Sequence, residues 1–366
     1  MKFTADRDVL GSALATAARA IVSRSGSLPV LSGVHLSLVG DMLTVTGTDL
    51  ELSIQVTETV NGVTDGVTCL PARLIVDVVK SSKAGPVTVD VVKGEAHISS
   101  GRSSSTVVAL NADDFPRIAP PELSAVSVSG TMLRAALDRV VFAASVDTTR
   151  TVITGVLFEV EGDGLRVVAT DSYRLAVADV AVSGVLDSDR KVIVPARALA
   201  ELSKLILGAD DVAVDFGERQ ASFAVGRTSI VTRLIEGEYP AYRRIIPEGQ
   251  PCRLVVSRDE MLDAIKRVKL FARDSVPIVL TMSNDGELVL SAASSDVGLA
   301  SESLDVEYAG PKMTIAFNPE FLAAGVGLVT GDSVVVTITD ALKPALIRSV
   351  GVDGCTYLLM PTKVAG

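Results

Sequence analysis

The feature that most constrains the fold of this chain is an internal repeat with a period of 124 residues. The segment LPARLIVDVV, which contains Pro71, returns as VPARALAELS with Pro195 and more faintly as FNPEFLAAGV with Pro319. A second pair, ADDFPRI with Pro116 and GEYPAYRRI with Pro240, has the same interval. Such repeats are one structural unit used several times. The 366 residues therefore predict three similar domains, over residues 1–121, 122–249 and 250–366.

Each repeat opens with an amphipathic helix, because its apolar residues fall three and four positions apart. These residues are Leu10, Leu14, Ala17 and Ile21 in the first repeat, Leu133, Leu137 and Val140 in the second, and Leu262, Ile265 and Val268 in the third. A hairpin of alternating apolar and polar residues follows, and a second helix begins at or near each proline of the repeat. The pattern is β-α-β-β-β, duplicated in each repeat. It predicts six helices on antiparallel sheets, an α+β architecture.

Several classes of protein are disfavoured by the sequence. No uncharged apolar run approaches the ~18 residues of a membrane span, and the polar start MKFTADRDVL is unlike a signal peptide, so we expect a soluble, cytoplasmic protein. The cysteines at 69, 252 and 355 stand far apart without a CxxC motif, and only His35 and His97 could add to them. We therefore expect no structural metal and no cofactor.

Enzyme motifs are also missing from the sequence. It has no GxSxG, HExxH or P-loop pattern, and the glycine-rich GVGLVTG at residues 325–331 lies in or after a predicted helix. A phosphate-binding loop needs the turn from a strand into a helix. We therefore expect a non-catalytic protein.

Basic residues gather on the predicted helices although the net charge is −10. Acidic residues concentrate in strands and loops, which suits a groove or hole for a polyanion. No aromatic residues interleave with the basic ones, so double-stranded DNA bound through its backbone, without sequence preference, is favoured over single strands. The candidate DNA-facing residues are Arg24, Arg73, Lys80, Arg134, Arg139, Arg197, Lys204, Lys266 and Arg267.

Together, the three repeats, the pair NADDFPRI and EGEYPAYRRIIP, the hairpin ATDSYRLAV and the terminal YLLMP resemble the β subunit of bacterial DNA polymerase III, the sliding clamp. The resemblance covers essentially the whole chain. It implies a homodimeric ring, joined head to tail, with sheets outside and helices lining a channel around duplex DNA. It also implies a role as a processivity factor, since a polymerase held on a closed ring re-engages before it diffuses away. The implied subunit faces are Thr106, Val107 and Val108 on one side and Leu270 and Phe271 on the other.

The resemblance further implies a pocket between the second and third domains. This pocket would receive short peptides of the polymerase catalytic subunit, the clamp loader, and other polymerases and repair proteins. An apolar cleft with a few placed polar groups and a flexible methionine suits such peptides. The matching positions are Ile153, Thr170, Tyr173, Arg174, Leu175, Pro240, Arg244, Ile245, Asn318, Phe321, Leu342, Pro344, Leu359, Met360 and Pro361.

The ATDSYRLAV hairpin differs from its two counterparts in spacing. The leucine stands three positions after the turn aspartate in Asp49–Leu52 and in Asp296–Leu299. In Asp171–Leu175 it stands four positions after. One extra residue predicts a bulge that re-aims neighbouring side chains, as at a functional site. The alternative is that Tyr173 and Arg174 only cap the turn.

The tail departs from the family pattern. Met360 and Pro361 precede Thr362, Lys363 and Val364, where the family commonly has an apolar residue, Arg and Leu. Loss of one apolar wall should weaken burial in the pocket by about 1 kcal/mol. Three interpretations remain open: a main clamp with a variant rim, a specialised second clamp with altered partner or inhibitor binding, and a repeat scaffold that does not bind DNA.

Overall fold

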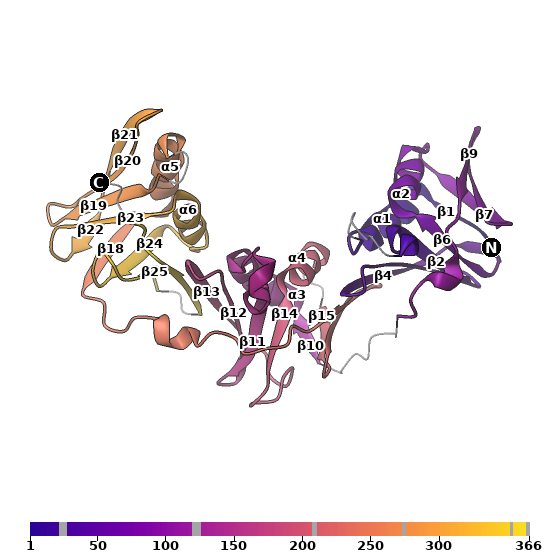
Figure 1. Cartoon of the computed structure of the whole chain (residues 1–366), viewed down its shortest axis with the longest axis horizontal. Helices are drawn as coiled ribbons and strands as arrows, with labels where there is room; N and C mark the ends of the chain where they lie inside the picture. Colours follow the sequence, from indigo (N-terminus) through magenta and orange to yellow (C-terminus); the bar gives the residue numbers. More distant parts are fainter. Residues whose placement is uncertain (22–27, 119–125, 207–210, 273–275, 352–353, 364–366) are drawn as a thin grey trace. The chain divides into compact units, whose positions relative to one another are not determined.

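The computed structural model describes residues 1–21, 28–118, 126–206, 211–272, 276–351 and 354–363. The chain divides into two compact units (Figure 1), Met1–Arg134 with Arg197–Leu234, and Ala135–Ala196 with Ile235–Gly366. The chain passes from one unit to the other within α3 (Gly130–Val140), at the start of α4 (Ala196–Leu205) and between Leu234 and Ile235. Each unit contains two antiparallel sheets.

The first unit has a five-stranded sheet, β5-β1-β7-β8-β9, and an eight-stranded sheet, β10-β15-β16-β17-β4-β3-β2-β6. Helices α1 (Arg7–Ala18) and α2 (Ala72–Ser81) pack against each other and on these sheets. The strands are β1 (Lys2–Asp6), β2 (Gly33–Val39), β3 (Met42–Thr48), β4 (Leu52–Thr59), β5 (Asn61–Thr64), β6 (Gly66–Pro71), β7 (Pro86–Val92), β8 (Glu95–Ser100), β9 (Ser103–Val108), β10 (Ser127–Ser129), β15 (Asp211–Phe216), β16 (Gln220–Val225) and β17 (Thr228–Arg233).

The second unit has a nine-stranded sheet, β14-β11-β12-β13-β26-β25-β24-β18-β22, and a four-stranded sheet, β21-β20-β19-β23. Helices α5 (Arg258–Val268) and α6 (Pro319–Gly327) pack against each other. The strands are β11 (Gly155–Glu161), β12 (Gly164–Thr170), β13 (Arg174–Val180), β14 (Lys191–Pro195), β18 (Cys252–Ser257), β19 (Ile278–Ser283), β20 (Glu287–Ser294), β21 (Gly298–Asp305), β22 (Glu307–Ala309), β23 (Met313–Phe317), β24 (Ser333–Ile338), β25 (Ala345–Ser349) and β26 (Cys355–Leu359).

Local sequence explains where these elements begin. The side chains of Asp6, Ser257 and Asn318 accept hydrogen bonds from backbone N–H groups in the first turns of α1, α5 and α6, which the helix itself leaves unpaired. Strands such as β24 alternate buried and half-buried residues, as expected of a sheet with only one face on the core. The sequence pattern therefore specifies both the helix starts and the buried faces.

The predicted architecture is confirmed. The described residues form six α-helices, two for each repeat and one for each copy of the β-α-β-β-β pattern, on antiparallel sheets. Each of the two larger sheets combines strands from two repeats, through β17–β4 in the first unit and β13–β26 in the second. Within the described part of the chain, none of the helices is long and apolar enough to cross a membrane.

Candidate functional site

The strand pair β13–β26, which we call the seam, places the ATDSYRLAV hairpin beside the YLLMP end of the chain. Leu175 lies opposite Leu358, and Arg174 lies opposite Leu359. The pairing extends one residue further, because the Met360 N–H donates to the Tyr173 carbonyl over 2.9 Å. Two segments far apart in sequence thus form neighbouring strands of one sheet.

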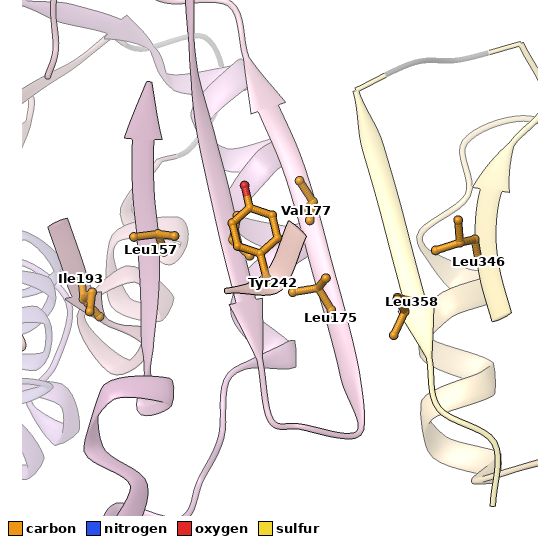
Figure 2. Packing of buried hydrophobic residues seen from close by; sticks show 8 residues of the cluster. Leu157, Leu175, Val177, Ile193, Tyr242, Leu346 and Leu358 are labelled. Atoms are coloured by element: carbon orange, nitrogen blue, oxygen red, sulfur yellow. The ribbon is translucent and has the colours of Figure 1, made fainter. Parts of the chain in front are cut away.

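One face of the seam is a buried apolar floor (Figure 2). Leu175 and Leu358 share this floor with Leu157, Val168, Val177, Ile193, Tyr242 and Leu346. Met360 is partly buried against the same cluster, together with Val152, Ile235, Tyr239 and Ile246. The floor therefore includes residues from both repeats and from the segment that connects them, residues 235–250.

A cleft of about 630 Å³ lies at this floor. Leu157, Ile193 and Tyr242 belong to both the floor and the cleft, while Lys191 and the other residues of 237–244 form its remaining walls. The predicted pocket residues Pro240 and Arg244 are among these walls. An apolar bottom with a few polar groups at its edge is the usual lining of a ligand site.

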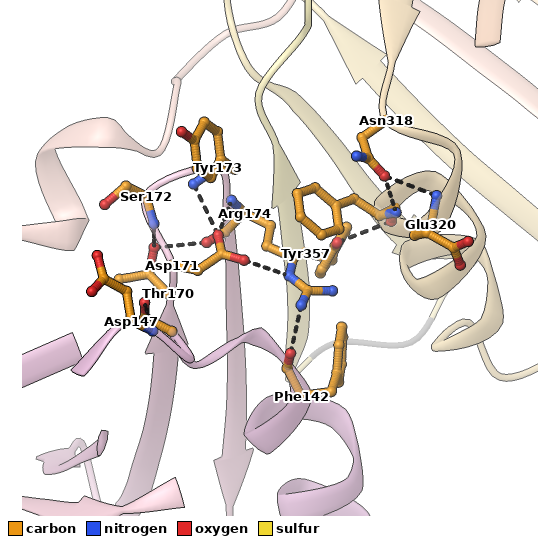
Figure 3. A network of polar contacts seen from close by, with 12 residues as sticks. Phe142, Asp147, Thr170, Asp171, Ser172, Tyr173, Arg174, Asn318, Glu320 and Tyr357 are labelled. Atoms are coloured by element: carbon orange, nitrogen blue, oxygen red, sulfur yellow. Dashed lines mark hydrogen bonds and ion pairs between the residues drawn. The ribbon is translucent and has the colours of Figure 1, made fainter. Parts of the chain in front are cut away.

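The turn at Thr170–Arg174 is built from local hydrogen bonds (Figure 3). The Thr170 hydroxyl donates to the Arg174 carbonyl over 2.7 Å and accepts from the Ser172 N–H over 3.1 Å. The Asp171 carboxylate accepts from the N–H groups of Tyr173 and Arg174 over 2.9 and 3.0 Å. The turn is thus held rigid by its own side chains.

The predicted bulge in this hairpin is wrong. Thr170 pairs with Leu175 as Thr48 pairs with Ser53, so the two turns have equal length. The Thr48 hydroxyl also bonds the Leu52 carbonyl and the Leu50 N–H, which repeats the pattern at Thr170. Leu52 therefore corresponds to Arg174 and not to Leu175. The middle copy therefore differs from the first in having arginine, Arg174, at the position that Leu52 occupies in the first copy.

Arg174 connects the hairpin to the rest of the second repeat and to the third repeat (Figure 3). Its guanidinium donates to the Asp171 carboxylate over 2.9 Å and to the Phe142 carbonyl over 2.7 Å. Its central carbon lies 4.2 Å from the ring centroid of Phe321 and 5.0 Å from that of Phe142. Arg174 thus does more than cap a turn, because it also contacts α6 of the third repeat through Phe321.

Arg150 was missed by the sequence reasoning. Its guanidinium donates to the Asp147 carboxylate over 3.0 Å, to the Ser172 hydroxyl over 3.1 Å and to the Ser145 hydroxyl over 3.3 Å. The hydrogen bonds from Thr149 and Arg150 keep the pKa of Asp147 below its usual value. The sequence does contain a signal for this contact, because Asp147 stands three residues before Arg150. Asp147 also caps the 3-10 helix η4 (Thr148–Thr154).

The remaining predicted pocket residues differ in burial. Tyr173 and Leu342 are 61% and 85% exposed and Ile245 is also exposed, whereas Ile153, Thr170 and Leu359 are buried. The Tyr173 and Phe321 rings are 6.5 Å apart. Asn318 caps α6, Pro344 accepts a hydrogen bond from Gln250, and Pro361 is half-buried. Leu358 was missed; its alternate position on β26 places it on the floor with Leu175.

Comparison with known proteins identifies the family. Models of the DNA polymerase III beta subunit match its N-terminal domain to residues 1–119, its central domain to 127–241 and its C-terminal domain to 243–363. The chain belongs to the DNA polymerase III β-subunit family, the β sliding clamps. This membership makes the protein a non-catalytic processivity factor of DNA replication whose partners include DNA and a polymerase. It excludes the non-DNA scaffold.

Individual sliding clamps are similar over their full length. The clamp of Staphylococcus aureus (strain Mu50) is 31% identical and that of Staphylococcus epidermidis is 32% identical, with 99% of both chains covered in each case. The solved clamp from Bartonella birtlesii bound to griselimycin has 31% identity and a TM-score of 0.94, covering 100% of both chains. The clamp from Pseudomonas aeruginosa has 30% identity and a TM-score of 0.91, covering 99% of this chain and 100% of that one.

The candidate DNA-facing residues of this sliding clamp fall into two groups. Arg73, Lys80 and Lys266 are exposed on their helices. Four others have polar contacts within the protein. Arg197 donates to the Asp49 carboxylate and to the carbonyls of Arg19 and Ala20, and Arg134 donates to the Ile206 carbonyl. Arg267 pairs with Glu302 and Lys204 with Glu201, while Arg139 is half-buried. Arg24 lies outside the described residues.

The candidate subunit faces of the clamp combine exposed and covered positions: Thr106, Val108 and Leu270 are exposed, Phe271 is half-buried and Val107 is buried. Thr106, Val107 and Val108 belong to β9, the last strand of its sheet, and Val108 is 68% exposed. Leu270 and Phe271 form part of the 3-10 helix η6 (Lys269–Phe271), and Leu270 is 67% exposed. A free strand edge with exposed apolar side chains is a favourable surface for pairing with another chain.

Proposed function

We propose that the seam and its cleft receive short peptide segments of the proteins that this clamp tethers to DNA. These are the catalytic subunit of DNA polymerase III, the clamp loader, and other polymerases and repair proteins. The observation that carries the proposal is the floor around Leu175, Leu358 and Met360. Tyr173, Ile245 and Leu342, which lie within a few residues of floor residues along the chain, have exposed side chains. Apolar anchors of a bound segment would be buried there, as at the centre of a peptide interface. The griselimycin bound by the Bartonella birtlesii clamp supports a ligand site in this family.

We further propose that two chains form a head-to-tail ring around double-stranded DNA in the cytoplasm. Residues 106–108 of one subunit would meet Leu270 and Phe271 of the other, and domains over 1–121, 122–249 and 250–366 would repeat around the ring. A heterologous interface of this kind closes when the rotation per subunit allows it. The exposed Arg73, Lys80 and Lys266 support backbone contacts with DNA that need no sequence preference.

Whether the chain is the main clamp or a specialised copy depends on the rim of the seam. Thr362 and Lys363 are exposed, and the Lys343 ammonium lies 3.7 Å from the Asp340 carboxylate. A polar rim reduces the apolar area that a partner can bury. A specialised clamp would therefore bind the usual peptides weakly while still forming a dimer.

The test measures binding of a fluorescent peptide that carries the clamp-binding segment of the polymerase. We expect Arg244→Ala and Met360→Ala each to weaken binding by about tenfold, or ~1.4 kcal/mol, because each truncates a side chain at the site. Arg102→Ala and Met42→Ala are matched controls on exposed positions of the first unit, and should bind as the wild type does.

Two other outcomes discriminate between the interpretations. Equal binding by the wild type and both site variants would place the peptide elsewhere. A wild type that fails to bind, while light scattering shows a dimer, would identify a specialised clamp whose changed rim excludes the usual partners.

A further inference from the structure

The connecting segment 235–250 forms one wall of the proposed peptide site but has few backbone contacts with its surroundings. Its backbone is anchored at Ile235, whose N–H donates to the Ile193 carbonyl over 2.8 Å. Among residues 236–249, all of them described, the backbone–backbone hydrogen bonds are local: Tyr242 N–H to Pro240 and Arg244 N–H to Ala241. The position of this wall must therefore depend on side chains.

Two side chains of the wall, Tyr242 and Arg243, meet at the carboxylate of Glu159, although Arg243 also pairs with Glu161 and the Tyr239 hydroxyl donates to the Val168 carbonyl over 3.4 Å. Glu159, on β11, is 3% exposed. Its Oε1 accepts from the Tyr242 hydroxyl over 2.5 Å and from Arg243 Nη2 over 2.6 Å, and its Oε2 accepts from Lys191 Nζ over 2.8 Å. A buried carboxylate with charged partners is stable only while these contacts are kept.

Tyr242 and Arg243 transmit this anchor to the site. The Tyr242 ring belongs to the floor, beside Leu175 and Val177 (Figure 2), and the Arg243 guanidinium lies 5.3 Å from the centre of that ring. Pro240 precedes this pair and Arg244 follows it, and both line the cleft. A shift of Tyr242 would therefore also move Pro240 and Arg244, the cleft residues before and after it.

We propose that Glu159 is a positioning residue for peptide binding, which acts through Tyr242 and Arg243 to fix the wall formed by residues 237–244. The inference rests on the proposed function and adds a residue that need not touch the peptide. Its physical basis is preorganisation. When the wall is already fixed in the free protein, none of the binding free energy is spent on ordering it.

The charge state of Glu159 gives the proposal a pH dependence. Burial works to raise its pKa, but the hydrogen bonds from Lys191, Tyr242 and Arg243 outweigh burial, so the pKa lies below its ordinary value. The stabilising contribution is therefore complete above the ordinary glutamate pKa and is lost as the pH falls through the lowered value. The charged groups around this carboxylate are Lys191 on β14, Arg243 in the connecting segment, Glu161 on β11, Arg166 on β12 and Asp179 on β13.

The test combines Glu159→Gln, Tyr242→Phe and the double variant in the full-length chain, with the fluorescent polymerase peptide as probe. We expect each single variant to weaken binding by about fivefold to tenfold, and the double variant to be no weaker than the worse single one, because both remove the same anchor. Glu58→Gln is the matched control, since Glu58 lies on strand β4 of the first unit and is ion-paired with Arg227.

Further readouts separate positioning from a general loss of structure. Glu159→Gln should remain a dimer with a near-native unfolding midpoint, should lose protection of the Tyr242 and Arg244 amides from hydrogen exchange, and should bind peptide with a flatter acid limb than the wild type. Wild-type affinity in Glu159→Gln, or additive losses in the double variant, would overturn the inference while leaving the peptide site intact. Failure of the wild type to bind would instead show that this site does not take the usual peptides, as in a specialised clamp, and would overturn the inference with it.

Discussion

At the scale of single residues, Gly325 shows how close packing shapes the third repeat. A Cβ atom at this position would lie 2.4 Å from Cδ1 of Tyr357 and 3.0 Å from Cδ1 of Ile347. The Tyr357 ring is buried, and its hydroxyl donates to the Phe321 carbonyl over 2.9 Å. Glycine thus allows α6 to approach β26. Close packing therefore accounts for Gly325, the first glycine of GVGLVTG.

We expect Gly325→Ala to destabilise the protein by about 1–3 kcal/mol, because the added methyl group must displace a buried ring. Gly327, in the same helix, has nothing within 4 Å of its would-be Cβ and is the matched control. Gly327→Ala should be neutral or stabilise by up to ~1 kcal/mol, since alanine restricts the unfolded chain. Urea unfolding of both variants checks the prediction, and a Gly325→Ala protein as stable as Gly327→Ala would contradict it.

At the scale of elements, the turns at Thr48 and Thr170 show a limit of sequence reasoning. The spacing from aspartate to leucine suggested an insertion in the middle copy, yet the turns have the same length and hydrogen bonds. The error arose because leucine was used as the marker of register, while the equivalent of Leu52 is Arg174. Backbone geometry is set by the Thr-Asp pair that begins each turn, which the sequence does show in both copies.

This equivalence predicts a pair of matched effects. Thr170→Val and Thr48→Val keep the side-chain shape but remove a buried hydroxyl that bonds two backbone groups in each turn. We expect each variant to lose about 1–3 kcal/mol of stability, because the partners are left unpaired. Only Thr170→Val should also weaken peptide binding, since its turn carries Tyr173 and Arg174. Equal peptide affinity in the two variants, measured by fluorescence anisotropy, would contradict this prediction.

At the scale of the whole molecule, the repeat and the polarity pattern were enough to predict six helices on antiparallel sheets. They could not predict which strands join the repeats, because β13 and β26 meet through pairing between distant segments that leaves no local signal. For the same reason Leu358 and Glu159 were missed. Only the register of the seam distinguishes Leu358, which lies on the floor, from its neighbour Leu359. Glu159 is identified by its partners, which come from β14 and the connecting segment.

The last prediction concerns assembly, which depends on the sheet edge at β9. Val108 there and Leu270 in η6 are about equally exposed, and the proposed ring would bury both. Val108→Lys and Leu270→Lys should each cost the interface ~3 kcal/mol or more, because an unpaired charge would be buried. Light scattering should show monomers, and closed circular DNA should no longer retain the protein. Val39→Lys is the matched control, since Val39 is 68% exposed on β2 of the first unit, away from the β9 edge. A Val108→Lys protein that remains dimeric and stays on circular DNA would show that β9 does not form the subunit interface.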